Sequence, residues 1–307
     1  MPIIEVNHLA KSYGDRRAVR DVSFAVESGE IFGILGPNGA GKTTTVECVA
    51  GLRKRDGGAI SVLGVDPASD RAAIREQVGV QLQECELPER IRVDEALELY
   101  ASFYQHPADW RELREVLGLG AHGSQRYGKL SGGQKQRLSI ALALIGDPTI
   151  AILDELTTGL DPAARRETWA LIERVRDRGV TVILVTHFMA EAEHLCDRIA
   201  IIDNGQVTAI DTPAGLVARA GAQQRVRFRP SAPIDLADLQ GLDEVSSVEQ
   251  AGPTVIVTGT GDVLAAVTSL LARHQVIARE LRVEQASLDD AFLVMTGHQL
   301  DTEGSPA

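Results

Sequence analysis

An α/β core built on a largely parallel sheet is the fold that this sequence of 307 residues predicts. Short β-branched runs alternate with amphipathic stretches up to about residue 220, and this alternation is typical of such a core. A glycine-rich turn follows one apolar run and an acidic pair ends another, and both lie where open α/β sheets bind ligands. After residue 221 the pattern changes to a second, smaller α+β series.

The first part of the chain is expected to hold seven strands and six helices, with extra strands near the N-terminus. β-Branched apolar runs predict strands over residues 3–9, 22–26, 31–35, 78–82, 150–153, 180–185 and 199–202. Apolar residues at helical spacing predict helices over residues 42–50, 93–104, 110–117, 132–145, 162–178 and 189–196.

Residues 222–300 are expected to form a separate small α+β domain, with residues 1–221 as the first domain and residues 301–307 as a frayed tail. Residues 222–307 hold six basic and twelve acidic side chains, so this part is more acidic per residue than the rest. The order strand, helix, strand, strand, helix, strand fits a ferredoxin-like arrangement. The expected strands are 226–228, 245–250, 254–258 and 278–283, and the helices are 235–239, 262–274 and 288–296.

Composition excludes several classes of protein. Hydrophobic residues make up 44% and charged residues 24% of the chain, which are values of a folded protein rather than a disordered one. A net charge of −12 disfavours nonspecific binding to nucleic acids. No apolar run approaches the roughly 18 residues of a spanning helix, and no leader pattern opens the chain, so we expect a cytoplasmic protein without direct membrane insertion.

A phosphate-binding loop is predicted after the apolar run 31–35. The segment Gly36-Pro37-Asn38-Gly39-Ala40-Gly41-Lys42-Thr43 matches G-x-x-x-x-G-K-[ST] and opens a helix that continues through Thr44. Glycines let backbone N–H groups turn toward phosphates, Lys42 neutralises their charge, and the Thr43 hydroxyl ligates Mg²⁺. The alternative is an ordinary glycine-rich turn, but only five lysines occur in the chain, so the match predicts nucleotide binding.

Two carboxylates end the apolar run 150–153. Asp154 is expected to hold Mg²⁺, and Glu155 to act as the general base that activates the attacking water. The alternative for an acidic pair after a strand is a helix cap. Together with a phosphate-binding loop on the same chain, the pair favours catalysis.

A second phosphate-binding segment is predicted at the start of the helix 132–145. Ser131 suits the N-cap, and Gly132 and Gly133, followed by Gln134, let an anion approach the free N–H groups of the first turn. The alternative is an ordinary capped helix. One loop and one spare phosphate-binding helix in one chain suggest that two chains share each nucleotide.

The segment Leu130-Ser131-Gly132-Gly133-Gln134 resembles the LSGGQ signature of ATP-binding cassette (ABC) ATPases, and the likeness extends over about residues 3–220. It implies a P-loop NTPase cassette with a RecA-like core, an N-terminal antiparallel β subdomain and a helical subdomain, which binds ATP and Mg²⁺. The resemblance also assigns Ser131, Gly132, Gly133 and Gln134 to the ATP of an opposite subunit.

Tyr13, in Lys11-Ser12-Tyr13-Gly14, is similar to the aromatic residue that stacks on adenine in this family, although packing is the alternative. Gln83 resembles the glutamine that contacts Mg²⁺ and water and couples to the membrane partner. Gln81 is a second candidate on the same strand face, and the spacing from Gly79 favours Gln83.

Asp161 lies in a segment that resembles the loop contacting the opposite subunit. His187 resembles the switch histidine that reaches the γ-phosphate. The alternative for a single histidine after a strand is a structural role.

The family usually has proline after the catalytic glutamate, whereas this chain has Leu156. Leucine restores a backbone donor and frees φ, so we expect hydrolysis to persist with a less rigid loop.

Residues 279–292 are similar to the ending of drug-export ATPases, the daunorubicin-resistance and sodium-export relatives. In that branch the ATPase is a separate polypeptide. The resemblance therefore implies a homodimer that powers a separately encoded permease from the cytoplasmic face of the membrane and exports drug-like or lipophilic compounds.

Three alternatives stay open. A soluble ABC ATPase acting on ribosomes or DNA is disfavoured, because such proteins usually have two cassettes or a coiled-coil insertion and a basic face. A nucleotide sensor that does not hydrolyse ATP is disfavoured by the complete set of acidic residues and histidine. The C-terminal domain is expected to stabilise packing and the dimer, with regulation by a small ligand as the alternative.

Overall fold

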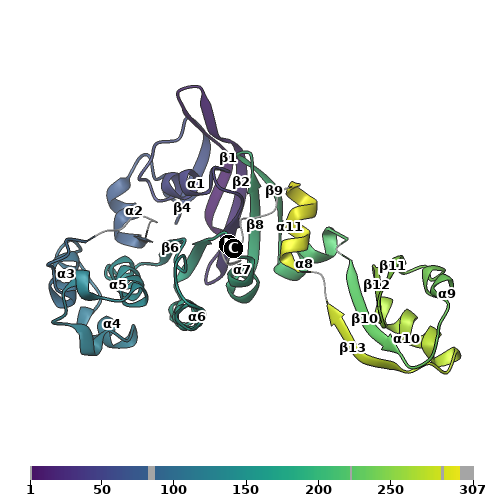
Figure 1. Ribbon diagram of the computed structural model, residues 1–307. Coiled ribbons are helices and arrows are strands. Elements are labelled where there is room, and N and C mark those ends of the chain that lie inside the picture. The colour runs from purple at the N-terminus through teal and green to yellow at the C-terminus, as the bar shows by residue number, and fades with distance from the viewer. Residues whose placement is uncertain (1, 82–86, 222, 285–286, 298–307) are drawn as a thin grey trace. The chain divides into compact units, whose positions relative to one another are not determined.

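The computed structural model describes residues 2–81, 87–221, 223–284 and 287–297. Its contacts divide the chain after Pro213, whereas the change in sequence pattern placed the boundary after residue 221. The first unit contains a nine-stranded sheet, and the second contains a four-stranded sheet (Figure 1).

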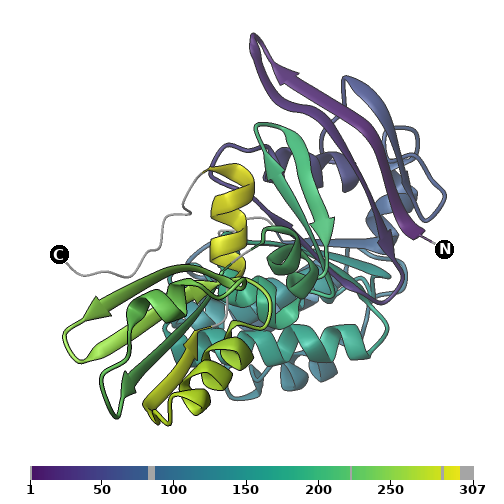
Figure 2. The ribbon, with the colours of Figure 1, turned by 90° about the vertical axis from the view of Figure 1, so that its right-hand side faces the viewer.

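The large sheet has the order β4-β1-β2-β9-β8-β3-β7-β6-β5. One side is antiparallel, where β1 pairs with both β2 and β4, and Figure 2 shows β1 and β2 as a long purple hairpin. The other side is parallel from β8 to β5. The strands are β1 (Pro2–Tyr13), β2 (Arg16–Glu27), β3 (Ile31–Leu35), β4 (Gly57–Val62), β5 (Val78–Gln81), β6 (Ile150–Asp154), β7 (Thr181–Val185), β8 (Arg198–Asp203) and β9 (Gln206–Asp211).

The helices of the first unit pack in different ways. α3, α4 and α5 contact one another and form a helical cluster, while α1 packs on β1, β2 and β4 (Figure 1). None of the described helices is long and apolar enough to span a membrane. The helices are α1 (Lys42–Val49), α2 (Arg71–Gln77), α3 (Val93–Ala101), α4 (Trp110–Val116), α5 (Gly132–Leu144), α6 (Pro162–Asp177), α7 (Met189–Leu195) and, at the division, α8 (Pro213–Arg219).

The strands at the centre of the parallel side are buried along their whole length. Every residue of β3, β6 and β7 is buried, which explains why these strands are continuous apolar runs rather than alternating ones. At the carboxyl ends of these three strands, Asp154 is the polar residue, and it is 1% exposed. A buried carboxylate needs a compensating partner, so this end of the sheet is where a charged ligand is expected.

The structure contains elements that the sequence pattern did not predict. These are strands β4 and β9 and helices α2 and α8, and helix α3 ends at Ala101 rather than at residue 104. β9 follows β8 through Asn204 and Gly205, which have φ values of 49° and 74°. Asn-Gly between two β-branched runs is a strong hairpin signal, so β9 could have been found from the sequence.

The second unit has its own core. Its strands β10 (Gln224–Pro230), β11 (Val245–Ala251), β12 (Thr254–Gly259) and β13 (Ala278–Glu284) pair antiparallel in the order β11-β12-β10-β13, the order of a ferredoxin-like sheet. Phe228, Val257 and Val267 are fully buried in this core. Its helices are α9 (Leu236–Gln240), α10 (Val263–Arg273) and α11 (Leu288–Thr296), and residues 301–307 lie outside the described part.

Candidate functional site

The carboxyl ends of three neighbouring strands build the site. β3 and β6 both pair in parallel with β7, and Val185 lies opposite Ile34 on one side and Asp154 on the other. The segments that follow these strands therefore meet at one edge of the sheet. They are the glycine-rich loop from Gly36, the pair at Asp154 and Glu155, and the turn at His187.

The loop can take its course only because of its glycines. A Cβ atom added to Gly36 would lie 2.1 Å from the Ile202 carbonyl oxygen, and one added to Gly41 would lie 2.4 Å from the Ala18 carbonyl oxygen. Gly41 also has a φ of 102°, which side chains rarely adopt. The loop thus lies so close to β8 and β2 that only glycine fits at positions 36 and 41.

Lys42 begins α1 and is 6% exposed. Its Nζ donates hydrogen bonds to the carbonyl oxygens of Gly36 at 2.8 Å and Pro37 at 3.2 Å. Burial lowers the pKa of Lys42, while Glu155 and Asp154 oppose that shift. The ammonium is held inside the loop, where phosphate oxygens would replace the carbonyls as its partners.

Asp154 has the properties of a metal ligand. Its Oδ2 accepts a hydrogen bond of 3.0 Å from Thr43 Oγ1, whereas its buried Oδ1 has no hydrogen-bond partner. Burial, with a smaller contribution from Glu155, raises the pKa of Asp154 to about 6, against the lowering effects of Thr43 and Lys42. A hydroxyl and a carboxylate with an unused oxygen are donors that fit Mg²⁺.

Gln81 lies at the end of β5, next to Asp154. Its Oε1 accepts a hydrogen bond of 3.2 Å from the Asp154 backbone N–H, and its side chain is buried. Gln83, the residue favoured as the coupling glutamine, lies outside the described residues.

Glu155 and His187 are in contact. Glu155 Oε1 lies 3.3 Å from His187 Nδ1, and both side chains are largely buried. Glu155 has a φ of 51°, and its backbone N–H donates to the Val185 carbonyl oxygen at 2.9 Å. Neither acid of the pair caps a helix; that role falls to Asp161, at the start of α6. Leu156 is fully buried.

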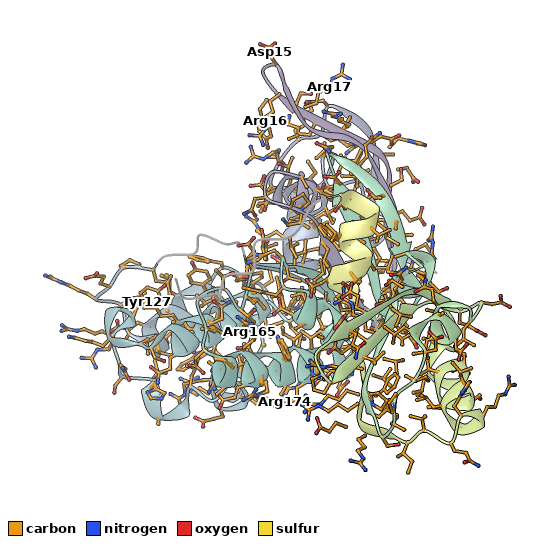
Figure 3. All side chains as sticks on the ribbon, turned by 45° about the vertical axis from the view of Figure 1, so that its right-hand side comes forward. Asp15, Arg16, Arg17, Tyr127, Arg165 and Arg174 are labelled. Carbon is orange, nitrogen blue, oxygen red and sulfur yellow. The ribbon has the colours of Figure 1, made fainter. Side chains whose placement is uncertain are left out.

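A pocket of about 510 Å³ is lined by seven of the predicted nucleotide-binding residues, together with Glu155. Tyr13 lies at its rim, 41% exposed, with the Arg53 guanidinium 5.2 Å from its ring centre. Arg16, labelled in Figure 3 near the tip of the β1–β2 hairpin, also lines it and was not predicted. The lining residues are Tyr13, Arg16, Ala18, Asn38, Gly39, Gly41, Lys42, Thr43, Thr44 and Glu155.

The second predicted phosphate-binding segment does not line this pocket. Ser131 caps α5 by accepting from the Gln134 backbone N–H, and Gln134 Oε1 accepts from the Ser131 N–H at 2.9 Å. Asp161 Oδ1 accepts from the Ala163 and Ala164 N–H groups, and its pKa is lowered by these bonds.

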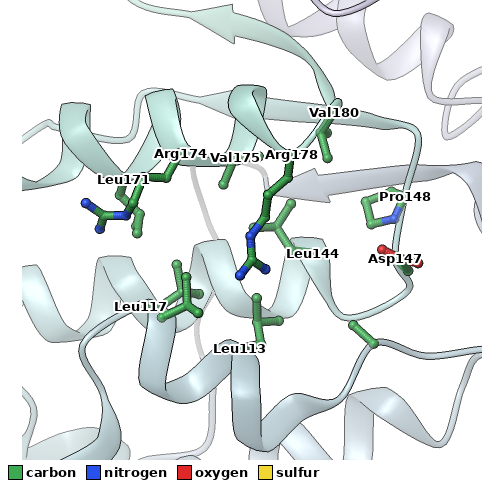
Figure 4. A pocket seen from close by; sticks show the side chains of 12 residues that line it. Leu113, Leu117, Leu144, Asp147, Pro148, Leu171, Arg174, Val175, Arg178 and Val180 are labelled. Atoms are coloured by element: carbon green, nitrogen blue, oxygen red, sulfur yellow. The ribbon is translucent and has the colours of Figure 1, made fainter.

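A second pocket lies between α4, α5 and α6 (Figure 4). Leu113, Leu144 and Val175 give it apolar walls, and Arg178 reaches across it to pair with Glu112 at 3.2 Å. None of the predicted site residues lines it.

Comparisons with known proteins identify the family of this chain. Residues 19–158 match the family described as ABC transporter. The Nod factor export ATP-binding protein I of Rhizobium sp. (strain N33) is 36% identical over 306 residues, covering 97% of this chain and 98% of that protein. The chain belongs to the ABC transporter family.

Other relatives of this ABC ATPase are named for drug resistance. The daunorubicin/doxorubicin resistance ATP-binding protein DrrA of Streptomyces peucetius is 34% identical over 311 residues, covering 97% of this chain and 93% of that protein. The cassette MJ0796, solved as a dimer in a post-hydrolysis state with ADP and Pi, has a TM-score of 0.62 and 25% identity, covering 68% of this chain and 98% of that chain.

These findings confirm the predicted family, fold and enzyme class. The chain is an ATP-binding and ATP-hydrolysing subunit of the drug-resistance and export type. The soluble ATPase of ribosomes or DNA is not favoured, because relatives that match the chain along nearly its whole length are named as export or drug-resistance ATP-binding proteins.

Proposed function

We propose that this ABC ATPase binds Mg²⁺ and ATP between two copies of the chain and thereby powers the export of drug-like or lipophilic compounds through a separately encoded permease. The observation that carries the proposal is the meeting of Lys42, Thr43, Asp154, Glu155 and His187 at three adjacent strand ends. Side chains of these types bind phosphate, ligate metal ions and activate water.

Each side chain has a distinct part in hydrolysis. Lys42 exchanges its loop carbonyls for β- and γ-phosphate oxygens, and Thr43 and Asp154 would hold a Mg²⁺ ion, which would supply charge neutralisation at the phosphates. Glu155 accepts a proton from the attacking water, and His187, bonded to Glu155, reaches the γ-phosphate. Positioning and electrostatics supply most of the acceleration in such phosphoryl transfer.

A second copy completes the site in this proposal. Ser131, Gly132 and Gly133 open a helix N-terminus, which attracts phosphate, yet they do not line their own chain's pocket. In a head-to-tail pair, this N-terminus faces the γ-phosphate bound by the partner, and Asp161 lies at the contact between copies. Loss of the phosphate bridge after hydrolysis opens the pair.

Coupling to cargo is assigned to a permease on the cytoplasmic face of the membrane. Gln83, as a ligand of the metal and water, and the residues up to Glu89 pass the motion to a loop of that permease. Residues 222–300 act as an accessory domain that stabilises packing and the dimer. The export relatives, named for Nod factor and for daunorubicin or doxorubicin, support this direction of transport.

Three measurements test the proposal. Purified protein is expected to release phosphate from ATP only with Mg²⁺, and a nucleotide-dependent dimer is expected in the presence of ATP. Co-expression with the product of a neighbouring membrane-protein gene is expected to recover both proteins together from detergent. Recovery with ribosomes instead, and no membrane protein, contradicts the transport role while leaving the ATPase intact.

A further inference from the structure

Glu191, on α7, is a buried carboxylate that the mechanism above does not use. It is 0% exposed, among the buried residues Met189, Ala192 and Leu195 of the same helix. Glutamate is rarely buried completely unless it is paired, because its charge loses the solvation of water. The burial of Glu191 must therefore be explained by the groups that surround its carboxylate.

The Glu191 carboxylate contacts a different helix through its first oxygen. Oε1 accepts a hydrogen bond of 3.2 Å from Trp169 Nε1, on α6. Burial raises the pKa of the carboxyl, and the hydroxyls of Thr186 and Thr157 act against that shift. The side chain thus bonds to α6 and lies beside two further segments, the loop that follows Glu155 and the turn that holds His187.

Each of those segments carries a proposed catalytic or dimer residue. Thr157 comes two residues after Glu155, and Thr186 comes directly before His187. Thr186 Oγ1 also accepts the backbone N–H of Phe188 at 3.0 Å, so the turn around His187 is tied on both sides.

Arg165 of α6, labelled in Figure 3, belongs to the same group. Its guanidinium carbon lies 4.4 Å from the centre of the Phe188 ring, and its charge also lowers the pKa of Glu191. Arg165 Nε, Thr157 Oγ1 and Glu191 Oε2 are buried without a partner in full hydrogen-bond geometry. A buried hydrogen-bonding group without a partner destabilises a rigid core, but it allows hydrogen bonds to be exchanged when the loops move.

We propose that Glu191 is a positioning residue that ties the turn at His187 to the loop between Glu155 and Asp161. A γ-phosphate sensed at His187 then changes the position of the loop that faces the second copy. The inference rests on the proposed function, because it gives Glu191 a part in the coupling of ATP state to that loop. The competing explanation is a buried polar group that only stabilises the fold.

The chain offers a built-in reporter for the test. It contains two tryptophans, Trp110 and Trp169, so a Trp110→Phe background leaves the indole that donates to Glu191 as the only one. Glu191→Gln keeps the shape and an acceptor for that indole but removes the charge, and Glu191→Ala removes both. Glu193→Gln makes the same charge change at an exposed position of the same helix and is the matched control.

We expect kcat to fall roughly tenfold in Glu191→Gln and further in Glu191→Ala, as for residues that couple sites, while the Kd for ATP changes by less than about threefold. Trp169 fluorescence is expected to distinguish ATP from ADP in the parent and in Glu193→Gln but not in the Glu191 variants. Circular dichroism and melting temperature check that each variant is folded.

Three outcomes overturn the inference. One is a folded Glu191→Gln variant with parental kcat and a parental fluorescence difference between ATP and ADP. Another is parallel loss of ATP affinity and melting temperature without a selective loss of kcat, which is the result of a structural role. The third is an equal effect of Glu193→Gln. A parent protein without ATPase activity would contradict the proposed function instead, so the two failures are distinguishable.

Discussion

Glu155 Oε1 and His187 Nδ1 lie 3.3 Å apart at the ends of two adjacent strands, β6 and β7. The two side chains therefore form one unit rather than two independent contributors. A histidine in this position fixes the direction of the carboxylate, and the carboxylate fixes the tautomer of the ring. The pair places a carboxylate that can accept a proton beside the ring that is proposed to reach the γ-phosphate.

Replacing Glu155 with glutamine is expected to lower ATP turnover by at least about 100-fold, because the amide cannot accept the proton of the attacking water. ATP binding is expected to persist, since the lysine, the glycines and the metal ligands are unchanged. Phosphate release and equilibrium ATP binding measure the two properties, with Glu193→Gln as a control. Unchanged turnover would remove Glu155 from the role of base.

His187→Ala is expected to reduce turnover by about 100-fold, the scale on which loss of one transition-state donor acts. Because the two side chains are in contact, the double variant Glu155→Gln, His187→Ala is expected to be little slower than the slower single variant. A double-variant cycle on kcat measures this coupling. Fully multiplicative effects would show that the two groups act separately.

Asp154→Asn is expected to stabilise the protein without nucleotide while abolishing Mg²⁺-dependent hydrolysis. The pKa of Asp154 is about 6 in the folded protein, above its unfolded value of about 3.9. Protonated Asp154 therefore adds to the free energy of unfolding at low pH, and this contribution is lost as the pH rises from about 4 to 6.

The amide of Asp154→Asn stays neutral at pH 7, so the variant avoids this loss of about 1–3 kcal/mol in the free energy of unfolding. Urea unfolding at pH 4 and pH 7 measures the difference between the parent and Asp154→Asn. The gain is expected at pH 7 and is expected to shrink at pH 4. An asparagine variant less stable than the parent at pH 7 would contradict the prediction.

Gly41→Ala is expected to destroy ATP binding. The new Cβ meets the Ala18 carbonyl oxygen, and the φ of 102° adds backbone strain of about 1–3 kcal/mol, so the loop must leave its position. Gly29 is the matched control, since it has a φ of 80° and nothing within 4 Å of an added Cβ. Gly29→Ala is expected to lower stability but keep the ATP affinity of the parent, as isothermal titration measures.

Phe228→Ala is expected to destabilise the second unit by about 3–5 kcal/mol, because the ring is fully buried in that core. ATP binding to single chains is expected to stay unchanged, while the mass of the ATP-bound species falls toward that of the monomer. Light scattering measures the mass, and Leu281→Ala, at a partly exposed site, is the control. A full-sized dimer with an unfolded second unit would favour the regulatory alternative for this domain.

Much of the fold could be predicted because the central strands are continuous apolar runs. β3, β6 and β7 are recognisable without alternation, since both faces of a parallel sheet are covered by helices. β4 was missed because it begins with Gly57 and Gly58, and glycine is uncommon in strands. α2, with seven residues and only Ile74 buried, has too short an apolar pattern to be seen.

The site could be predicted where one continuous segment carries several phosphate-binding or metal-binding groups, as in the loop that ends at Lys42 and Thr43. Residues that reach the pocket through tertiary structure could not be predicted. Arg16 lines it because the β1–β2 hairpin brings it there. Glu191 looks like a surface residue in a charged helix, and only the packing of α7 shows it to be buried.

The left-handed backbone at Glu155 has a consequence for anyone who evolves this enzyme in the laboratory. At a φ of 51°, a residue with a Cβ pays about 1–2 kcal/mol that glycine does not. A library screened only for heat resistance would therefore enrich glycine or asparagine at position 155 and return robust but inactive clones. Screens of this chain need turnover as a second criterion from the first round.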